Sequence, residues 1–436
     1  MNTFQYDVIV IGSGPGGASA AKNLSLAGKK VLILEKGKYY KSYKGSYKNT
    51  LLMLDRFGFF KSLEKVNMLK VSAVGGATML YSGSAAEPPL WLKEKYNIDL
   101  TKYSKEISKE LNISILPGKY LGKASSNIME AGNRLGHEWE PMPKFINLNK
   151  VKNNKISGAK TSIGENFGER WTALEYIEEA VKNGAKLLTS TECTELIVEN
   201  GVIKGVKAKT KKGRENKYFA KKVVLSGGGI PSPVLLQKAG IKNAGKGCII
   251  DPTILVYGIS KNKGTYKDPL VSVVSWKWYE SDGIRLGTFI DPPVTVFISL
   301  AKSGIKNILK ILKYPKMVGI LVKIKDELGG YVDEDGNVSK ELTISDMKKI
   351  EKGIKLAEQV LIESGCSKDS IVRGEIRGAH PGGTCRILNV VDKNLETEIK
   401  NLFVCDASIF PEALDRPTVL TILSFGKRLS DYIIGS

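Results

Sequence analysis

Six consecutive residues near the start of the chain, Gly12-Ser13-Gly14-Pro15-Gly16-Gly17, have the spacing of a phosphate-binding turn. An expected strand at 6–11 precedes them and an expected helix at 18–27 follows, so unpaired amides at the helix start would face a pyrophosphate. The next apolar run, 30–34, ends in Glu35, where an acidic side chain can bind ribose hydroxyls. The combination predicts a dinucleotide site. The alternative is a glycine-rich helix start without a ligand.

One histidine has the setting of a proton-transfer residue. Histidine titrates near neutral pH without any perturbation, which suits a general base. The chain has only two, and His380 directly precedes Pro381-Gly382-Gly383, a turn that can present a side chain to a pocket. His137 is expected to be an ordinary surface or helix-end residue. Two histidines cannot form a histidine-rich metal site, and no metal is expected.

Length and composition bound the class of protein. A chain of 436 residues with 42% hydrophobic residues fits a globular protein of two domains. No uncharged apolar stretch reaches the length of a membrane span, and the N-terminus leads almost directly into a strand, so we expect neither a span nor a signal peptide. Five cysteines without disulfide or metal spacing favour a reducing cytosol. The net charge of +21 comes from lysines spread along the chain, so nucleic acid is not an expected partner.

The remaining sequence shows two different patterns of expected secondary structure. Before residue 251 we expect a glycine-rich run suited to a flat ligand at 71–86, a helix at 171–183, strands at 186–188, 194–198, 202–208 and 218–225, glycines at 227–229 and a helix at 232–239. From 251 to about 374 the alternation is typical of antiparallel strands. There we expect strands at 271–278, 284–290 and 294–299, then helices at 303–313 and 345–364. The end returns to glycines, with a strand at 401–405 and a closing helix from 418.

The segment 303–313 allows two interpretations. As a helix it carries Ile305, Ile308, Leu309 and Leu312 on one face and lysines elsewhere. The favoured interpretation buries that apolar face inside the protein. The alternative lays the helix on an anionic membrane surface.

Three blocks then coincide: the opening glycine turn, Gly75-Gly76-Ala77-Thr78, and His380-Pro381-Gly382-Gly383-Thr384-Cys385-Arg386 with the stretch from Asn401 to Glu412. Together they resemble the glucose–methanol–choline (GMC) family of FAD oxidoreductases. The segments 169–173 and 183–185 look most like the branch of long-chain alcohol oxidases and short prokaryotic relatives. The resemblance implies an α/β fold, in which a Rossmann-like FAD-binding domain of the glutathione-reductase type contains an inserted α+β substrate domain built on an antiparallel sheet.

The resemblance also implies the domain limits. Residues 1–90, 156–250 and 374–436 would form the discontinuous FAD-binding domain. Residues 91–155 and 251–373 would form the substrate-binding domain.

Cofactor contacts follow from the same resemblance. Gly12 to Gly17 would hold the pyrophosphate, Glu35 the adenosine ribose, and the backbone at Cys193 the adenine. Asp406 would meet the ribityl or pyrophosphate region. The further residues expected beside the cofactor are Gly75, Gly76, Thr78, Gly227, Gly228, Pro417 and Thr418. No histidine lies near 75–100, where some relatives attach FAD covalently, so we expect non-covalent FAD. No cysteine precedes residue 193, so no iron–sulfur cluster is expected there.

The family oxidises alcohols by moving a hydride to flavin N5 while a base takes the hydroxyl proton, and His380 matches its catalytic histidine. Most members carry a second His or Asn beside the substrate oxygen, and that place is Pro417 here. Either His380 works alone, or Arg416 supplies charge, or the reaction differs. Leu80 and Tyr81 also stand where members often have Asn.

The expected function is oxidation of a CH–OH group on a lipophilic alcohol, with an unknown electron acceptor other than oxygen, so a dehydrogenase rather than an oxidase. One alternative is a flavoenzyme that acts on a C–C or C=C bond as a reductase. Another is a flavin-binding protein without catalytic activity. The expected location is cytoplasmic, with peripheral membrane contact through 303–313 as the variant.

Overall fold

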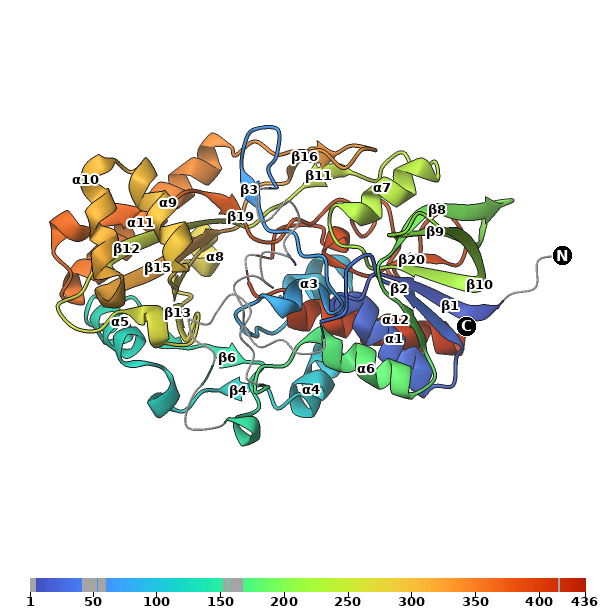
Figure 1. Cartoon of the computed structure of the whole chain (residues 1–436), viewed down its shortest axis with the longest axis horizontal. Helices are drawn as coiled ribbons and strands as arrows, with labels where there is room; N and C mark the ends of the chain where they lie inside the picture. Colours follow the sequence, from blue (N-terminus) through green and yellow to red (C-terminus); the bar gives the residue numbers. More distant parts are fainter. Residues whose placement is uncertain (1–4, 41–52, 54–59, 152–155, 157–167, 415) are drawn as a thin grey trace.

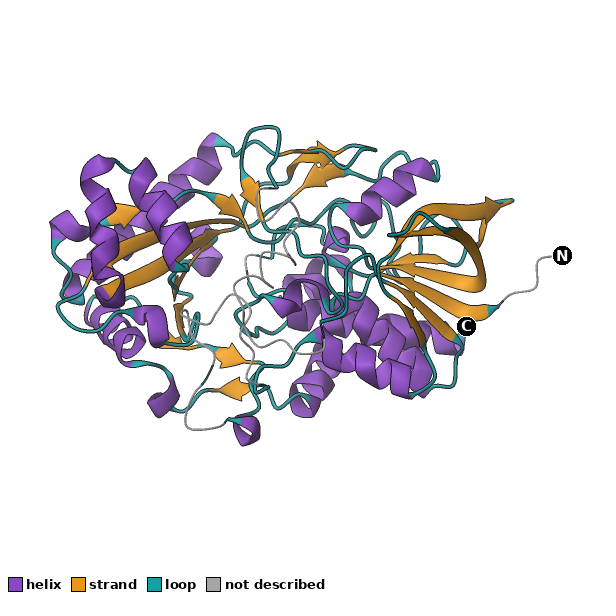
Figure 2. Cartoon of the chain, in the orientation of Figure 1, coloured by secondary structure: helices purple, strands orange, loops and turns teal. Residues whose placement is uncertain are grey.

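The computed structural model describes residues 5–40, 53, 60–151, 156, 168–414 and 416–436. Two large sheets lie at opposite ends of the molecule, and each carries packed helices (Figure 1). Loops and short elements occupy much of the region between them (Figure 2).

The first sheet has a parallel part that ends at the glycine-rich segments. Its buried runs at 8–11 and 31–34 are typical of parallel strands covered on both faces. The strand order is β7 (Lys186–Leu188), β2 (Val31–Leu34), β1 (Tyr6–Ile11), β10 (Glu215–Leu225), β9 (Val202–Thr210) and β8 (Thr191–Glu199), with β20 (Leu402–Val404) parallel to β10. The N-terminal half of β10, the longest strand, pairs antiparallel with β9, and β9 pairs antiparallel with β8.

The helix α1 (Pro15–Leu26) follows the glycine turn and packs against both α6 (Ala173–Lys182) and α12 (Val419–Gly435). Proline at its first position loses no hydrogen bond, because that N–H has no partner inside a helix. A Cβ added at Gly16 would lie 1.9 Å from the carbonyl oxygen of Cys405, so only glycine allows this approach. The glycine spacing therefore brings the chain's two ends together.

Residues 91–111 pack with the first sheet. The helices α3 (Trp91–Tyr96) and α4 (Thr101–Glu110) place Leu92 and Ile107 in the same core as β1 and β2. The helix α4 contacts α12, and Lys22 of α1 forms an ion pair with Glu110. The domain limits expected for 91–155 stay a prediction, and in the structure the first part of this range packs on α12 through α4.

The second sheet is almost entirely antiparallel, and only β3 and β19 pair in parallel. The helices α11 (Ile344–Glu363) and α5 (Lys123–Arg134) pack into the apolar core on one face of it. Lys323 stands opposite Thr253 on one side and Arg285 on the other. The strand order is β3 (Asn67–Met68), β19 (Arg377–Gly378), β12 (Pro252–Ile259), β15 (Met317–Ile324), β14 (Ile284–Thr288), β13 (Val273–Ser275) and β5 (Trp139–Pro141), with β18 (Val372–Arg373) also on β12.

Smaller elements complete the described part of the chain. The strands are β4 (Ser114–Ile115), β6 (Pro143–Lys144), β11 (Lys246–Cys248), β16 (Gly329–Val332) and β17 (Val338–Ser339). The helices are α7 (Pro231–Lys238), α8 (Tyr279–Asp282), α9 (Pro293–Lys302) and α10 (Ile305–Ile308). The short 3-10 turns are η2 (Gly76–Met79), η3 (Gly118–Tyr120), η4 (Leu148–Lys150), η5 (Thr265–Lys267), η6 (Leu309–Lys316), η7 (Lys368–Ser370) and η8 (Ala407–Ile409).

The strand expected at 294–299 is wrong, because this segment belongs to the helix α9. Its β-branched residues suggested a strand, but Pro292 and Pro293 precede it as they often precede a helix. Val296, Ser299 and Leu300 are buried at helical spacing. Tertiary packing therefore overrides the local preference.

The favoured interpretation of 303–313 is also wrong. The segment forms the short helix α10 and then η6, and its expected buried face is largely exposed. Ile305, Leu309 and Leu312 are all exposed, and Ile308 is half-buried. The core below is already filled by Val296, Leu300 and Tyr314. Among the described residues no helix has the length and apolar character needed to cross a membrane.

Candidate active site

The glycine turn between β1 and α1 is built by close backbone contacts. Gly12 has a φ of 95°, and a Cβ there would lie 2.3 Å from the carbonyl oxygen of Ser226. Gly17 likewise leaves no room for a side chain, because its Cβ would lie 2.1 Å from the carbonyl oxygen of Gly12. Gly14 differs, because no atom lies within 4 Å of its Cβ position. The turn is therefore packed on the protein side and open at Gly14.

The N-terminus of α1 suits an anion. Its first residue, Pro15, follows Gly14 at the cap position, where no side chain accepts from the helix amides, and the first turn holds no acidic residue. The start of α12 is similar, with Thr418 at the cap, Pro417 before it, no side-chain cap and no acid. Helix starts of this kind carry unpaired N–H groups and partial positive charge. The donor set fits a dinucleotide diphosphate at α1.

Glu35 directly follows β2 and binds both the glycine turn and its own loop through hydrogen bonds. Its carboxylate accepts hydrogen bonds from the Ser13 amide at 3.0 Å, the Ser13 hydroxyl at 2.6 Å and the Gly37 amide at 2.6 Å. The strand β8 begins beside it, because the Thr191 amide donates to the Glu35 carbonyl. This places Cys193 two residues further along β8. Burial raises the pKa of the Cys193 thiol to about 12, so this residue carries no thiolate at neutral pH.

The segment at 75–78 docks onto the glycine turn. The Gly75 amide donates to the Ser13 hydroxyl at 3.1 Å, and a Cβ on Gly76 would lie 2.8 Å from the Cα of Gly14. Thr78 donates to the Gly75 carbonyl at 2.6 Å and accepts from the Ala173 amide at 2.9 Å. The structure therefore brings the expected flavin-side and pyrophosphate-side segments together.

Asp406 follows β20 at the same sheet edge. One carboxylate oxygen accepts from the Gly228 amide at 2.8 Å and from the Ser232 hydroxyl at 2.6 Å, and the other accepts from the Ser408 amide at 2.8 Å. Gly227 continues from β10 and donates to the Ser232 hydroxyl at 3.1 Å. Glu35, Gly227, Gly228 and Asp406 thus follow the carboxyl ends of parallel strands, and Pro417 and Thr418 lie at the start of α12. The carboxyl ends of parallel strands are where open α/β sheets bind their ligands. Cys193 differs, because it lies inside β8, which pairs antiparallel with β9.

His380 follows β19 and faces two buried charges. Its Nδ1 lies 2.8 Å from Asp251 Oδ2 and 2.8 Å from Lys323 Nζ, and Lys323 Nζ lies 3.1 Å from the same carboxylate oxygen. The side chains of Asp251 and Lys323 are only 2% and 3% exposed. Both contacts use Nδ1, so Nε2 is the nitrogen through which this imidazole would meet a substrate.

The charges around His380 set its protonation. Burial and the Lys323 ammonium lower the pKa of His380, and the hydrogen bond to Asp251 opposes them without reversing the result. Burial alone would raise the pKa of Asp251, but Lys323 and His380 lower it below the usual range of a carboxyl. At neutral pH the site therefore holds a neutral imidazole beside an ionised aspartate.

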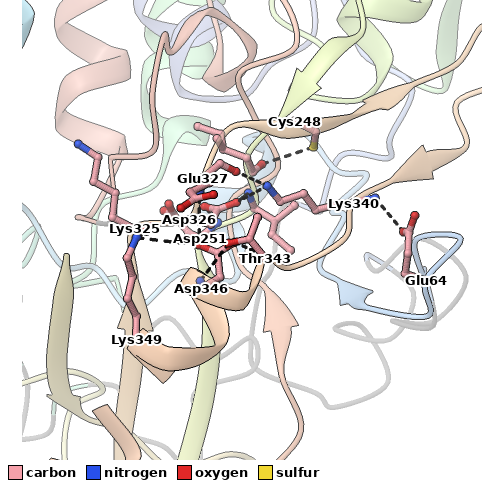
Figure 3. Close-up of polar contacts among 12 residues, drawn as sticks. Glu64, Cys248, Asp251, Lys325, Asp326, Glu327, Lys340, Thr343, Asp346 and Lys349 are labelled. Carbon is pink, nitrogen blue, oxygen red and sulfur yellow. Dashed lines mark hydrogen bonds and ion pairs between the residues drawn. The ribbon is translucent and has the colours of Figure 1, made fainter. Parts of the chain in front are cut away.

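A second buried pair holds the backbone of Asp251 (Figure 3). Asp251 has a φ of 49°, in the left-handed region that side chains rarely adopt. Asp326 accepts from the amides of Ile250 at 3.0 Å and of Asp251 at 3.1 Å, and it pairs with Lys340 at 3.0 Å. Burial raises the pKa of Asp326 to about 6, although Lys340 limits the rise. The position of the Asp251 carboxylate, which orients His380, thus depends on a strained backbone that the Asp326–Lys340 pair holds in place.

Two further basic residues, Arg285 and Lys144, are buried in the second half of the site. Arg285 is the cross-strand neighbour of Lys323, and its guanidinium lies 5.3 Å from the Trp276 ring centre. Lys144 on β6 donates to Ser84 Oγ at 2.8 Å and to the Leu270 carbonyl. Burial, Arg170 and Arg285 lower the pKa of Lys144 well below its usual value. Burial therefore disfavours the charged form of Lys144, whereas Arg285 and Lys323 remain two neighbouring cationic side chains on the sheet.

Arg416, a candidate for the missing second polar group, is held elsewhere. It donates to the Tyr279 hydroxyl at 3.0 Å and to the Glu87 carbonyl at 3.2 Å. Its guanidinium also lies 6.0 Å from the Trp276 ring, the same ring that Arg285 contacts. His137 ends the turn after α5, is buried against Trp278, and is therefore not a surface residue.

Sequence reasoning missed Asp251, Lys323, Asp326, Lys340 and Arg285. One signal was available, because Lys323 interrupts the buried run of β15 between Val322 and Ile324. A charged residue inside such a run is costly to bury unless it has a partner, and so marks a site worth examining.

Comparisons with known proteins show the family of this chain. The sequence model of the GMC oxidoreductase family matches residues 66–262 and again 337–426, and that of an FAD binding domain matches 7–45. A relative from Methanocaldococcus jannaschii, described as an uncharacterized protein, is 32% identical over 97% of this chain and 98% of its own. A long-chain-alcohol oxidase from Arabidopsis thaliana is 24% identical over 99% of this chain and 67% of its own.

Two solved structures share the fold. Formate oxidase from Aspergillus oryzae has a TM-score of 0.70 at 15% identity and covers 99% of this chain and 98% of its own. Pyridoxine 4-oxidase from Mesorbium loti has a TM-score of 0.70 at 16% identity and covers 98% and 99%. Fold and family matches together define an FAD-dependent oxidoreductase. The chain belongs to the GMC oxidoreductase family.

Proposed function

We propose that this protein oxidises a lipophilic alcohol, with His380 as the base that takes the hydroxyl proton. The observation that carries the proposal is the contact of His380 Nδ1 with the buried carboxylate of Asp251 at 2.8 Å. Similarity to a long-chain-alcohol oxidase supports the substrate class. FAD, when bound, supplies the hydride acceptor at flavin N5.

Asp251 gives the imidazole its direction. We assign the Nδ1 proton to the hydrogen bond with the ionised Asp251 carboxylate, which leaves the lone pair on Nε2. The Lys323 ammonium then donates to the same carboxylate oxygen, 3.1 Å away, and acts on Nδ1 only through its charge. The carboxylate also stabilises the imidazolium that forms when Nε2 takes a proton. Because the pKa of His380 lies below its usual value, the imidazole is in its basic form at neutral pH.

Pro417 cannot donate a hydrogen bond to the substrate oxygen, as the second His or Asn of the family would. We infer that the charge of Lys323 takes over this role. Its ammonium keeps the imidazole neutral before reaction, and together with Arg285 it makes this sheet face positive. A positive face favours the negative charge that develops on oxygen as the hydroxyl proton leaves. In this account Lys323 positions and tunes His380.

The experiment is anaerobic reduction of the bound flavin by primary alcohols of increasing chain length. The purified protein is expected to be yellow, to release its flavin on acid precipitation because the attachment is non-covalent, and to bleach fastest with long alcohols. His380→Ala should keep the flavin and reduce about 10²–10⁴-fold more slowly. His137→Asn, which alters the other histidine, should keep the wild-type rate. A wild-type rate in His380→Ala would remove the assigned base.

The electron acceptor is tested in the same samples. We keep the prediction of a dehydrogenase, whereas the named Arabidopsis thaliana relative is an oxidase. Slow reoxidation in air-saturated buffer supports a dehydrogenase, and rapid reoxidation makes the protein an oxidase.

Reduction of a C=C bond is the second candidate. It is favoured by the start of α12, where Pro417 and Thr418 offer neither an imidazole nor an amide. A yellow protein that no alcohol bleaches, but whose reduced flavin is reoxidised by an electron-poor alkene, would replace the alcohol proposal with this one. A yellow protein inert to both would be a non-catalytic flavin-binding protein.

A further inference from the structure

An apolar surface lies at the outer end of the second sheet. Ile305, Leu309 and Leu312 are 82%, 72% and 78% exposed and follow one another at spacings of four and three residues, which place them on one side of the α10–η6 turn. Val294 and Phe297 of the neighbouring helix α9 are a further 50% and 44% exposed. Figure 1 shows α9 and α10 far from β1 and β8. We call the residues 293–316 the lysine-rich face.

The charge of this face has one sign. No Asp or Glu occurs between Asp291 and Asp326 in the sequence, whereas Lys302, Lys306, Lys310, Lys313 and Lys316 all fall within the face. Lys302 pairs with Glu375, and Lys310 donates to the Asp369 carbonyl. Lys306, Lys313 and Lys316 are exposed beside the apolar side chains.

The face is firmly attached to the protein. Val296, Leu300 and Tyr314 are buried against Leu255 and Tyr257 of β12. The Tyr314 hydroxyl donates to the Asp291 carbonyl at 2.8 Å. The exposed residues are therefore presented by a packed support and have no neighbouring element of the described chain to cover them fully.

We infer that the lysine-rich face docks onto an anionic lipid bilayer. Exposed apolar side chains ringed by lysines match the interfacial region of such a membrane, where hydrocarbon lies just below negative headgroups. A second copy of the chain fits less well, because two like-charged faces would repel. A nucleic acid would use the lysines but leave the apolar side chains in water.

The supporting core of the lysine-rich face and the surroundings of His380 share one face of the second sheet. Leu321 contacts the same core as α9, and Lys323, two residues further along β15, points to the same sheet face. Residues of β15 thus connect the supporting core of the lysine-rich face with the neighbourhood of His380. This link to a membrane-borne substrate rests on the proposed function, but docking itself does not.

The test is flotation of the full-length flavin-loaded protein with vesicles of phosphatidylcholine, with and without phosphatidylserine. The wild type should float with anionic vesicles at low salt and be released by high salt. Ile305→Ser/Leu309→Ser/Leu312→Ser should lower the apparent affinity at least about tenfold. Lys306→Glu and Lys313→Glu should each lower it about fivefold or more. The matched control is Leu63→Ser/Ile344→Ser/Leu388→Ser, three exposed apolar residues outside the face, and it should float like the wild type.

The outcomes separate this inference from the proposed function, because flotation needs no turnover. Protein that remains in solution with anionic vesicles at low salt overturns it. Equal flotation of the triple-serine variant and the wild type also overturns it. A wild-type dimer on gel filtration that the triple-serine change dissociates would make the face a contact between copies instead.

Discussion

The two sides of the site are held in different ways. At the edge of the first sheet, backbone meets backbone, and glycines at 12, 16 and 17 allow contacts that a Cβ would block. At the edge of the second sheet, two buried charges, Asp251 just before β12 and Lys323 on β15, hold the imidazole that follows β19. Substitutions that add volume should therefore destabilise the first side most, and substitutions that remove a charge should destabilise the second side most.

The largest expected effect is on the buried pair behind Asp251. Asp326→Asn leaves Lys340 buried without its counter-ion, so the free energy of unfolding should fall by about 3–5 kcal/mol. Flavin reduction should slow as well, because asparagine has only one acceptor oxygen for the two amides of Ile250 and Asp251. Denaturant unfolding and the anaerobic reduction assay measure the two effects.

An exposed ion pair gives the control. Lys36 and Glu192 lie 2.8 Å apart with side chains 60% and 52% exposed. Glu192→Gln should change the free energy of unfolding by no more than about 1 kcal/mol. If the two variants lose equal stability, the charge-dependent view of the second side is wrong.

A glycine pair tests the first side. Gly16→Ala places a methyl group 1.9 Å from the Cys405 carbonyl oxygen and should cost roughly 1–3 kcal/mol of unfolding free energy through overpacking. Gly14→Ala should leave thermal stability of the flavin-free protein unchanged, because its Cβ position is open, but should lower flavin retention. Stability loss in both variants, or in neither, would contradict the contrast between the two positions.

The smallest expected effect is a shift in the pH dependence of flavin reduction, which tests the charges of the second side. The base is lost when His380 is protonated, so the rate should fall as pH drops through its pKa, which lies below the ordinary value of about 6.5. Lys323→Met removes a cause that lowers this pKa and should move the acidic limb to higher pH. Asp251→Asn removes a cause that raises it and should move the limb to lower pH. Shifts in the same direction would show that charge does not set the pKa.

The glycine turn of the first side could be predicted from the sequence because its information is local, whereas the position of Gly75 to Thr78 beside it followed from the family resemblance. The strand β1 has the expected bounds, and the glycine turn, Glu35 and Gly75 to Thr78 converge as expected. Helix α11 also lies within one residue of the expected range at either end. Glycine spacing and helical periodicity are properties of neighbouring residues, which a sequence displays directly.

The second side could not be predicted, because its information is long-range. Asp251, Lys323 and His380 meet only through the register of β12, β15 and β19. The same limit explains the error at 303–313, where periodicity predicted an apolar side but not what would cover it. It also explains α9, whose β-branched residues pack as a helix against Leu255 and Tyr257.

The central claim is that His380 is a neutral base with its proton on Nδ1, directed at Asp251. With only two histidines, nitrogen-15 NMR of the histidine-labelled, flavin-loaded protein can resolve both rings, and His137→Asn assigns them. We expect His380 to be protonated at Nδ1 alone at neutral pH and to gain its second proton only below the ordinary histidine pKa. A His380 ring that is doubly protonated at neutral pH, or protonated at Nε2 instead, would contradict this claim.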